Sequence, residues 1–152
     1  MVKDRSILCF ADRSARGALL AEHRAVLGLC LDWERLADTL PRLPGRRRWH
    51  VLAAGFRAFR DEHLPRIDRA VADIARTEGL AAHLVDHAER LAAFALADAD
   101  HSRDVEAAFA AVLGGAAAQP EALGFMLRCL FDGVRRTIVA REILLSVIGG
   151  AR

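Results

Sequence analysis

The stretch that decides the fold is PEALGFMLRCLFDGVRRTIVAREILLSVI, residues 120–148. Apolar side chains recur along it three or four positions apart, the spacing that keeps one stripe of a helix facing a core. The stripe consists of Leu123, Leu127, Leu130, Val134, Leu144 and Ile148. Pro120 suits the first turn of a helix, and the glycines at 149–150 suit its end. The sequence therefore predicts one long helix here.

Three earlier stretches carry the same kind of stripe, and we expect helices over about residues 15–40, 47–77 and 79–112. Pro41 ends the first of them, and residues 114–119 form the loop before the last helix. Pro65 falls inside the second, which predicts a kink or break near residues 62–65. Polar residues at 98–104 could bend or interrupt the third.

Four helices joined by short loops predict an all-α, up-down-up-down four-helix bundle. A length of 152 residues fits one domain with a real core. We place the bundle at residues 15–148, a C-terminal tail at 149–152 and an N-terminal arm at 1–14. The arm contains Ile7, Leu8 and Phe10, which could pack against the bundle.

Composition argues against two classes of partner. Twenty-two basic and 20 acidic residues give a net charge of only +2, too balanced for a nucleic-acid-binding surface. The run Arg46-Arg47-Arg48 before Trp49 is interpreted as a solvated loop before a helix. No apolar run reaches the ~20 residues that a membrane span needs. The start of the chain lacks a signal-peptide pattern, so we expect a cytoplasmic protein.

The informative positions are those where a stripe that should be apolar carries a polar residue, since bundles place metal and cofactor sites there. They are His23, His63, His87, Thr137 and Arg141. A single His on an apolar face is more often a hydrogen-bonded core or boundary residue, the interpretation favoured for His63. His83 and His87 are four apart and could both reach one metal ion.

Arg141 is the sharpest anomaly, because arginine is almost never fully buried without a partner. We expect it to lie in or beside the bundle interior and to meet a carboxylate. Asp68, Glu22 and Asp86 are the candidates, and the sequence does not choose among them.

Four short helical segments within about residues 17–148 together resemble the motifs of the hemerythrin-like family. The quoted segments are Ala21-Glu22-His23-Arg24 with Leu29-Cys30 and Glu34-Arg35-Leu36-Ala37-Asp38; Leu64-Pro65-Arg66-Ile67 running to Asp73-Ile74; Asp86-His87-Ala88-Glu89; and Arg135 to Glu142. The resemblance implies a hemerythrin-like bundle in which His23 and His87 match iron-binding histidines, with His83 available as a further one.

The same resemblance implies that most iron ligands have been replaced. Ile67 and Thr137 stand where histidines are expected, and Val71 and Arg141 stand where glutamates are expected. A two-iron centre needs bridging carboxylates, because the paired cations lie only ~3.5–4 Å apart. We therefore predict that the protein lacks a two-iron centre.

Two functions follow as expectations. The first is a non-enzymatic, metal-free hemerythrin-like bundle that binds a protein partner or a small apolar or anionic ligand, with no cofactor. The second is an oxygen or nitric oxide sensor that holds iron or haem through His23, His83 and His87.

An enzyme is the third possibility, although spacing shows no nucleophile–base pair, phosphate loop or paired-carboxylate motif. Cys9, Cys30 and Cys129 are interpreted as reduced thiols in or near the core. A nucleophilic Cys30 or Cys129 would need a nearby His.

Overall fold

The computed structural model describes residues 4–78, 80–117 and 119–150, without the side chains at 4–14, 77–78 and 149–150. Its elements are α1 (Asp4–Thr39), α2 (Arg46–Ala58), the π-helical turn η1 (Phe59–His63), α3 (Leu64–Glu78), α4 (Ala82–Leu113) and α5 (Pro120–Gly150). The structure is 90% helical, and the part it describes contains no strand. The all-α prediction is confirmed.

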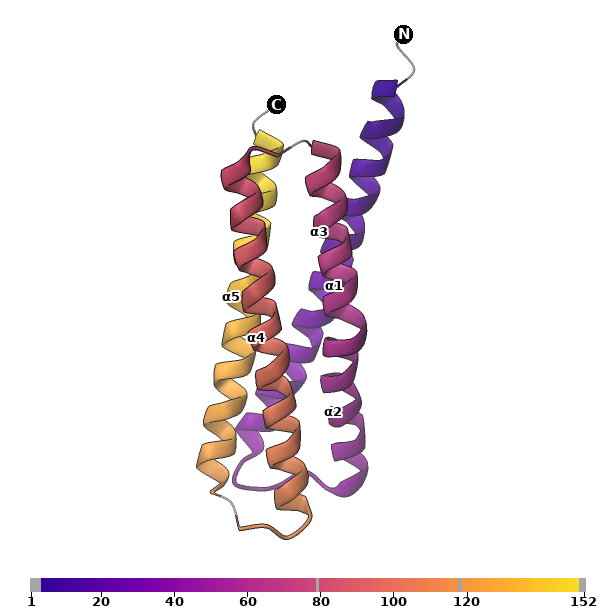
Figure 1. Ribbon diagram of the computed structural model, residues 1–152. Coiled ribbons are helices and arrows are strands. Elements are labelled where there is room, and N and C mark those ends of the chain that lie inside the picture. The colour runs from indigo at the N-terminus through magenta and orange to yellow at the C-terminus, as the bar shows by residue number, and fades with distance from the viewer. Residues whose placement is uncertain (1–3, 79, 118, 151–152) are drawn as a thin grey trace.

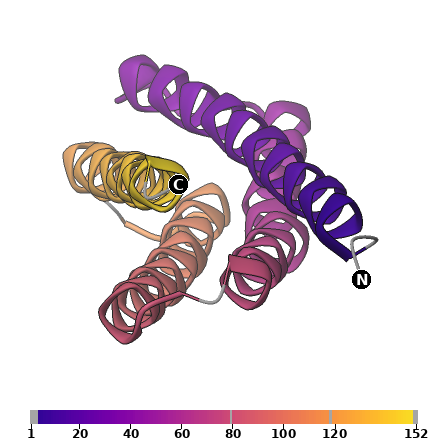
Figure 2. The same cartoon turned by 90° about the horizontal axis from the view of Figure 1, so that it is seen from above.

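The helices form an up-and-down four-helix bundle. Since α2, η1 and α3 follow one another without a loop, they make one bent rod, and α1, α4 and α5 make the other three. Figure 1 shows the four rods running in alternating directions. Seen from above, α1 crosses the bundle at an angle, and the end of α3 lies beside the start of α4 (Figure 2).

Several predicted boundaries were wrong. α1 begins at Asp4 rather than near residue 15, because no Gly or Pro before Gly17 breaks the helix. The expected packing of the N-terminal arm's Ile7, Leu8 and Phe10 lies outside the described side chains. α5 runs on to Gly150, so the expected tail at 149–152 begins within a helix. α4 begins at Ala82 and continues without a break through residues 98–104.

The expected disturbance near Pro65 is present, slightly earlier than predicted. Proline has no backbone N–H and so cannot donate to the carbonyl four residues before it. The chain responds with a wider turn over Phe59–His63, in which the N–H of Leu64 donates to the carbonyl of Phe59, five residues back. The second rod thereby passes Pro65 without ending.

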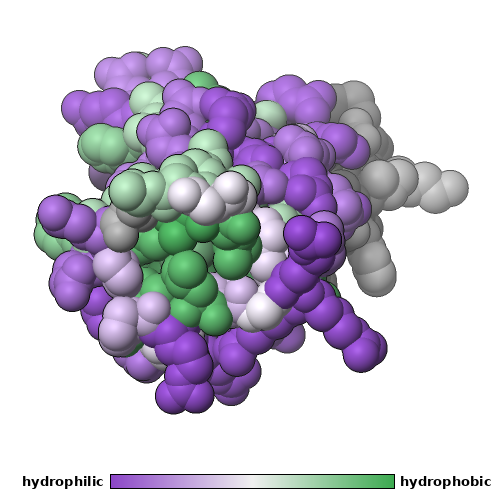
Figure 3. Space-filling view, turned by 90° about the horizontal axis from the view of Figure 1, so that it is seen from below, coloured by the Kyte–Doolittle hydropathy of each residue, from purple (hydrophilic) through white to green (hydrophobic). Residues whose placement is uncertain are grey.

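Aromatic stacking fixes the lower half of the core. Trp33 stacks on Phe56 with ring centroids 4.9 Å apart and meets Phe59 edge-on at 5.5 Å. Trp49 stacks on Phe109 at 5.4 Å, which ties α2 to α4. Figure 3 views this end from below and shows apolar side chains gathered between the helix ends inside a polar rim.

The upper end of the bundle has a smaller core of its own. Leu91, Leu144 and Ile148 form a cluster separate from the main core, with half-buried Leu80 and Leu84 against it. α1 packs mainly on α3 and α5, and α4 packs mainly on α5, whereas α3 and α4 make few contacts. The seam between α3 and α4 is therefore loosely packed.

Candidate ligand-binding cavity

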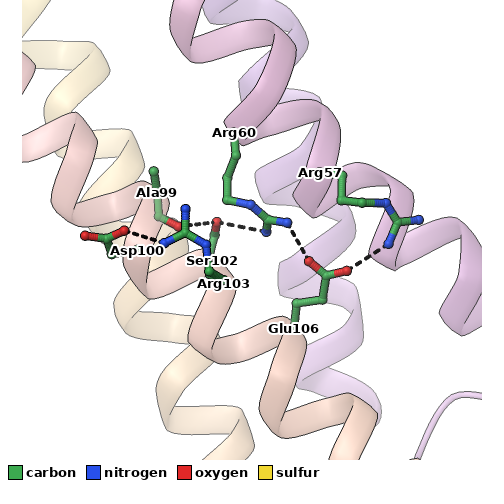
Figure 4. Close-up of polar contacts among 7 residues, drawn as sticks. All are labelled: Arg57, Arg60, Ala99, Asp100, Ser102, Arg103 and Glu106. Carbon is green, nitrogen blue, oxygen red and sulfur yellow. Dashed lines mark hydrogen bonds and ion pairs between the residues drawn. The ribbon is translucent and has the colours of Figure 1, made fainter.

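Below the loose seam, a charged cluster fastens the second rod to α4 (Figure 4). Glu106 accepts hydrogen bonds from Arg57 at 2.8 Å and from Arg60 at 2.7 Å. Arg60 also reaches Ser102 at 3.4 Å, and the Ser102 hydroxyl donates to the carbonyl of Ala99. These contacts close the lower half of the α2–α4 side, whereas α3 and α4 above them make few contacts.

At that seam lies a cavity of about 350 Å³. It separates the main core from the upper cluster, and its walls come from α1, α3, α4, α5 and Leu80 of the connection between α3 and α4. Apart from Asp68, Arg76, Glu89 and Arg141, every lining residue is apolar. Sites for small molecules typically measure about 300–1,000 Å³ and are mostly apolar with a few polar groups. The cavity fits that description.

Arg141 lies in the wall of this cavity and is only 4% exposed. Its Nη2 atom is 3.6 Å from Oδ1 of Asp68 and has no hydrogen-bond partner among the residues that the structure describes. Burial lowers the pKa of Arg141, which Asp68 and Asp98 partly offset, and burial also raises the pKa of Asp68. The expectation that Arg141 is buried beside a carboxylate is confirmed, with Asp68 as the partner. Glu22 instead contacts His63, at 2.6 Å.

The other side of Arg141 holds a carboxylate that the sequence reasoning missed. Asp98 and Arg141, together with Ile67 and Thr137, line a void of about 10 Å³, roughly the room of one water molecule. The Thr137 hydroxyl lies 3.1 Å from Oδ2 of Asp98 and 3.1 Å from the carbonyl of Gly133. Burial raises the pKa of Asp98, so this carboxyl takes up a proton more readily than an exposed one.

Asp98 approaches α5 closely because Gly133 has no side chain. A Cβ placed at Gly133 would lie 2.7 Å from Oδ1 of Asp98, far inside van der Waals contact. The sequence held one usable signal, since Asp98 lies in register with the apolar stripe of its helix. The prediction of a possible bend at residues 98–104 is wrong, because α4 is unbroken there and Asp98 lines the void beside Arg141.

His23 lies beside Arg141 and is 1% exposed. Its Nδ1 is 3.4 Å from Oε1 of Glu142, and within the described part of the chain its Nε2 has no hydrogen-bond partner. Burial and the charge of Arg141 lower the pKa of His23, which favours the neutral ring near pH 7. The contact with Glu142 assigns the ring proton to Nδ1, and Nε2 is then an unused acceptor.

The residues that the resemblance pointed to are only partly brought together. Ile67, Thr137 and Arg141 share the small void, Val71 and Arg141 share the large cavity, and His23 is beside Arg141. His83 is exposed and His87 is half-buried, and neither lines the void or the cavity.

The position of His87 has a geometric cause. Leu91 packs with Leu144 at the level of the upper cluster. His87 is one helical turn farther toward the end of the bundle, whereas Arg141 is one turn before Leu144 in the opposite direction. Within the described ranges, no three His, Cys, Asp or Glu side chains lie close enough together to hold a metal ion.

Burial makes Cys30 a poor nucleophile. Cys30 is buried and free, and burial raises the pKa of its thiol to about 12. Cys129 is free and half-buried, while the side chain of Cys9 lies outside the described set. In the part of the chain that the structure describes, no helix is both long and apolar enough to cross a membrane.

Comparisons with known proteins give no match: no family model, no curated protein sequence and no solved structure is similar enough to this chain to indicate a relative. What the cavity can do follows from its own residues. Its walls can enclose a mostly apolar molecule, and Arg141 can meet one acceptor group on that molecule.

Proposed function

We propose that this protein is a non-enzymatic binding protein that holds a small, largely apolar molecule between α3, α4 and α5. The observation that carries the proposal is the cavity of about 350 Å³, whose lining is apolar except for four charged residues. Atoms that line an empty apolar space lack packing partners on one side. A ligand that fills the space supplies those contacts and stabilises the folded state. A regulatory role would follow from this difference in stability between the free and the bound protein.

The proposal includes an origin as a hemerythrin-like bundle whose iron site has degenerated. Its support is that Arg141 shares the small void with Ile67 and Thr137, shares the cavity with Val71, and lies beside His23. Two of the residues that replace iron ligands, Ile67 and Val71, are apolar. A third, Arg141, is a buried cation, which opposes the binding of a metal cation. On this proposal the former metal cavity has become one wall of a ligand site.

One observation favours the alternative, an iron- or haem-based sensor of oxygen or nitric oxide. His23 directs Nδ1 at a carboxylate and leaves Nε2 free, which is how a metal-binding histidine is usually oriented. The alternative still needs His83 and His87, which the structure places away from His23. Iron and haem titrations followed by visible absorbance separate the two functions, because only the sensor gains a stoichiometric chromophore.

The binding proposal is tested with a neutral fluorescent probe, N-phenyl-1-naphthylamine, and a matched pair of variants. Ala92 lines the cavity, whereas its neighbour Ala93 is exposed and does not. Ala92→Phe should fill the cavity and weaken probe binding at least tenfold, and Ala93→Phe should bind the probe as the parent does. Circular dichroism checks that both variants fold. Equal probe binding by a folded Ala92→Phe variant would refute the cavity as the binding site.

A further inference from the structure

The wall of the cavity contains one buried hydrogen-bond donor that nothing in the structure uses. Arg141 is 4% exposed, and its Nη2 atom has no hydrogen-bond partner among the described residues. A buried polar group left without a partner costs free energy, and a charged group costs more than a neutral one. The buried Nη2 atom of Arg141 is explained if a bound molecule supplies a hydrogen-bond acceptor to it.

We propose that the ligand is a monocarboxylate with an unbranched hydrocarbon tail, its carboxylate bound by Arg141 and its tail enclosed by the apolar walls. This rests on the proposed binding function and names the class of ligand. A guanidinium presents its donors in a planar fork that matches the two oxygens of a carboxylate. The chemistry of the guanidinium therefore favours a carboxylate over a single hydroxyl.

Asp68 does not occupy that position. Its Oδ1 lies 3.6 Å from Nη2, beyond hydrogen-bond range, and its side chain is 45% exposed. A half-exposed carboxylate can turn toward water when a ligand oxygen arrives. Asp68 thus acts as a partner for Arg141 in the free protein and as a competitor for the ligand carboxylate.

The remaining charges limit the ligand to one anionic group. The charged lining residues are two acids, Asp68 and Glu89, and two bases, Arg76 and Arg141. Arg76 is mostly exposed and already paired with Asp73 on its own helix. A second anionic group on the ligand would meet Glu89 or Asp68 and be repelled. Dicarboxylates are therefore disfavoured.

The shape of the apolar part favours a tail. From Arg141 the cavity follows α5 past Leu144 to Ile148, seven residues along the helix, which is about 10 Å at 1.5 Å per residue. Each methylene that fits in this space should tighten binding about fourfold, the factor that corresponds to about 0.8 kcal/mol. The gain should stop once the tail reaches the end of the cavity.

The test is isothermal titration of the parent with butanoate, hexanoate, octanoate and decanoate, beside octanol and octylamine as matched neutral and cationic probes. We expect affinity to rise from butanoate along the carboxylate series until the tail fills the cavity and then to level off, and octanoate to bind at least tenfold more tightly than octanol. Arg141→Met should lose that advantage and leave octanol binding unchanged. Asp68→Asn should bind octanoate severalfold more tightly.

Arg103→Met is the matched control, because it removes a surface arginine that pairs with Asp100 and does not line the cavity. It should leave octanoate binding within twofold of the parent. If circular dichroism shows that Arg141→Met does not fold, Arg141→Lys takes its place. Lysine keeps the positive charge but lacks the planar pair of guanidinium donors, so octanoate binding should weaken at least threefold.

The outcomes separate the two proposals. If octanol binds in the cavity and octanoate binds no better, the binding function holds and the carboxylate inference is wrong. If Arg141→Met weakens octanoate and octanol equally, the inference is also wrong, because the arginine then acts only on the shape of the cavity. If neither ligand binds the folded parent, both proposals fail.

Discussion

The guanidinium of Arg141 on α5 faces the carboxylate of Asp68 on α3 with 3.6 Å between Nη2 and Oδ1, an ion pair without a hydrogen bond. The arginine is buried and the aspartate is half-exposed. Removing one partner of such a pair leaves a charge uncompensated, whereas replacing the buried charge by an apolar side chain removes its desolvation cost. The two halves of the pair should therefore respond differently to mutation.

Asp68→Asn should lower the free energy of unfolding by about 1–2 kcal/mol, a value reduced from that of fully buried pairs because Asp68 is partly solvated. Arg141→Met should change it by less than about 1 kcal/mol or raise it, since methionine fills the same space without a charge. Urea denaturation of both variants measures the difference. A larger loss for Arg141→Met than for Asp68→Asn would contradict this account of the pair.

The contact between Asp98 and Gly133 gives a second prediction. Gly133→Ala should destabilise the protein by about 1–3 kcal/mol, because the new Cβ would lie within 2.7 Å of the Asp98 carboxylate. Gly28→Ala is the control, since Gly28 is exposed on α1 with nothing within 4 Å of an added Cβ. It should raise stability by about 0.5–1 kcal/mol through helix propensity. Equal effects of the two changes would show that Asp98 does not approach α5 as described.

The charged cluster around Glu106 should matter more than an exposed ion pair of similar geometry. Glu106→Gln should cost about 2 kcal/mol, because Arg60 is 11% exposed and would lose its charged acceptor. Asp100→Asn breaks the Arg103–Asp100 pair, whose members are 63% and 73% exposed, and should cost less than about 0.5 kcal/mol. Thermal and urea denaturation should agree on this order. If Glu106→Gln leaves the free energy of unfolding unchanged, the cluster does not hold the second rod to α4.

Protonation of His23 should destabilise the protein below pH 6.5. Burial and Arg141 lower its pKa from the ordinary 6.5, so above that pH its ring is neutral in both folded and unfolded chains. As the pH falls from 6.5 toward the lowered folded value, the unfolded chain takes up a proton that the folded chain does not, and the free energy of unfolding falls.

The measurement is the free energy of unfolding of the parent and of His23→Gln between pH 7.5 and about pH 5, the range in which histidine titrates. The variant should show a flatter profile than the parent. Asp98, whose raised pKa makes stability fall as the pH rises, is present in both proteins, so the difference between the profiles isolates His23. Parallel profiles would mean that His23 is not buried as a neutral ring.

The helical architecture could be predicted because periodic stripes survive in a single sequence. The stripe from Leu123 to Ile148 and the effect of Pro65 both appear in the structure, the latter as the wide turn at Phe59–His63. Helix ends were less predictable, since their position depends on small propensity differences. α1 extends back to Asp4 because no residue in that stretch stops it, although its apolar period is weak.

The site was predicted in part. Arg141 attracted attention because a charge on an apolar stripe demands a partner, and that inference needs only the sequence. The choice of Asp68 depends on how α3 sits against α5, which no spacing reveals. Asp98 was missed because its burial follows from the absent side chain at Gly133 on another helix. The cavity arises where two core clusters fail to meet, a property of packing that a sequence pattern cannot show.

The most direct test of the binding account is methyl NMR of the Leu, Ile and Val side chains during titration with octanoate. We predict nuclear Overhauser effects from the tail of the ligand to methyl groups of Val71, Leu144 and Ile148, which line the cavity. The outward-facing apolar residues of α5, Val139, Ile143 and Val147, serve as the internal comparison, because they are 54%, 58% and 52% exposed. Contacts confined to those three residues would contradict the account, since the ligand would then lie on the surface of α5 and not inside the bundle.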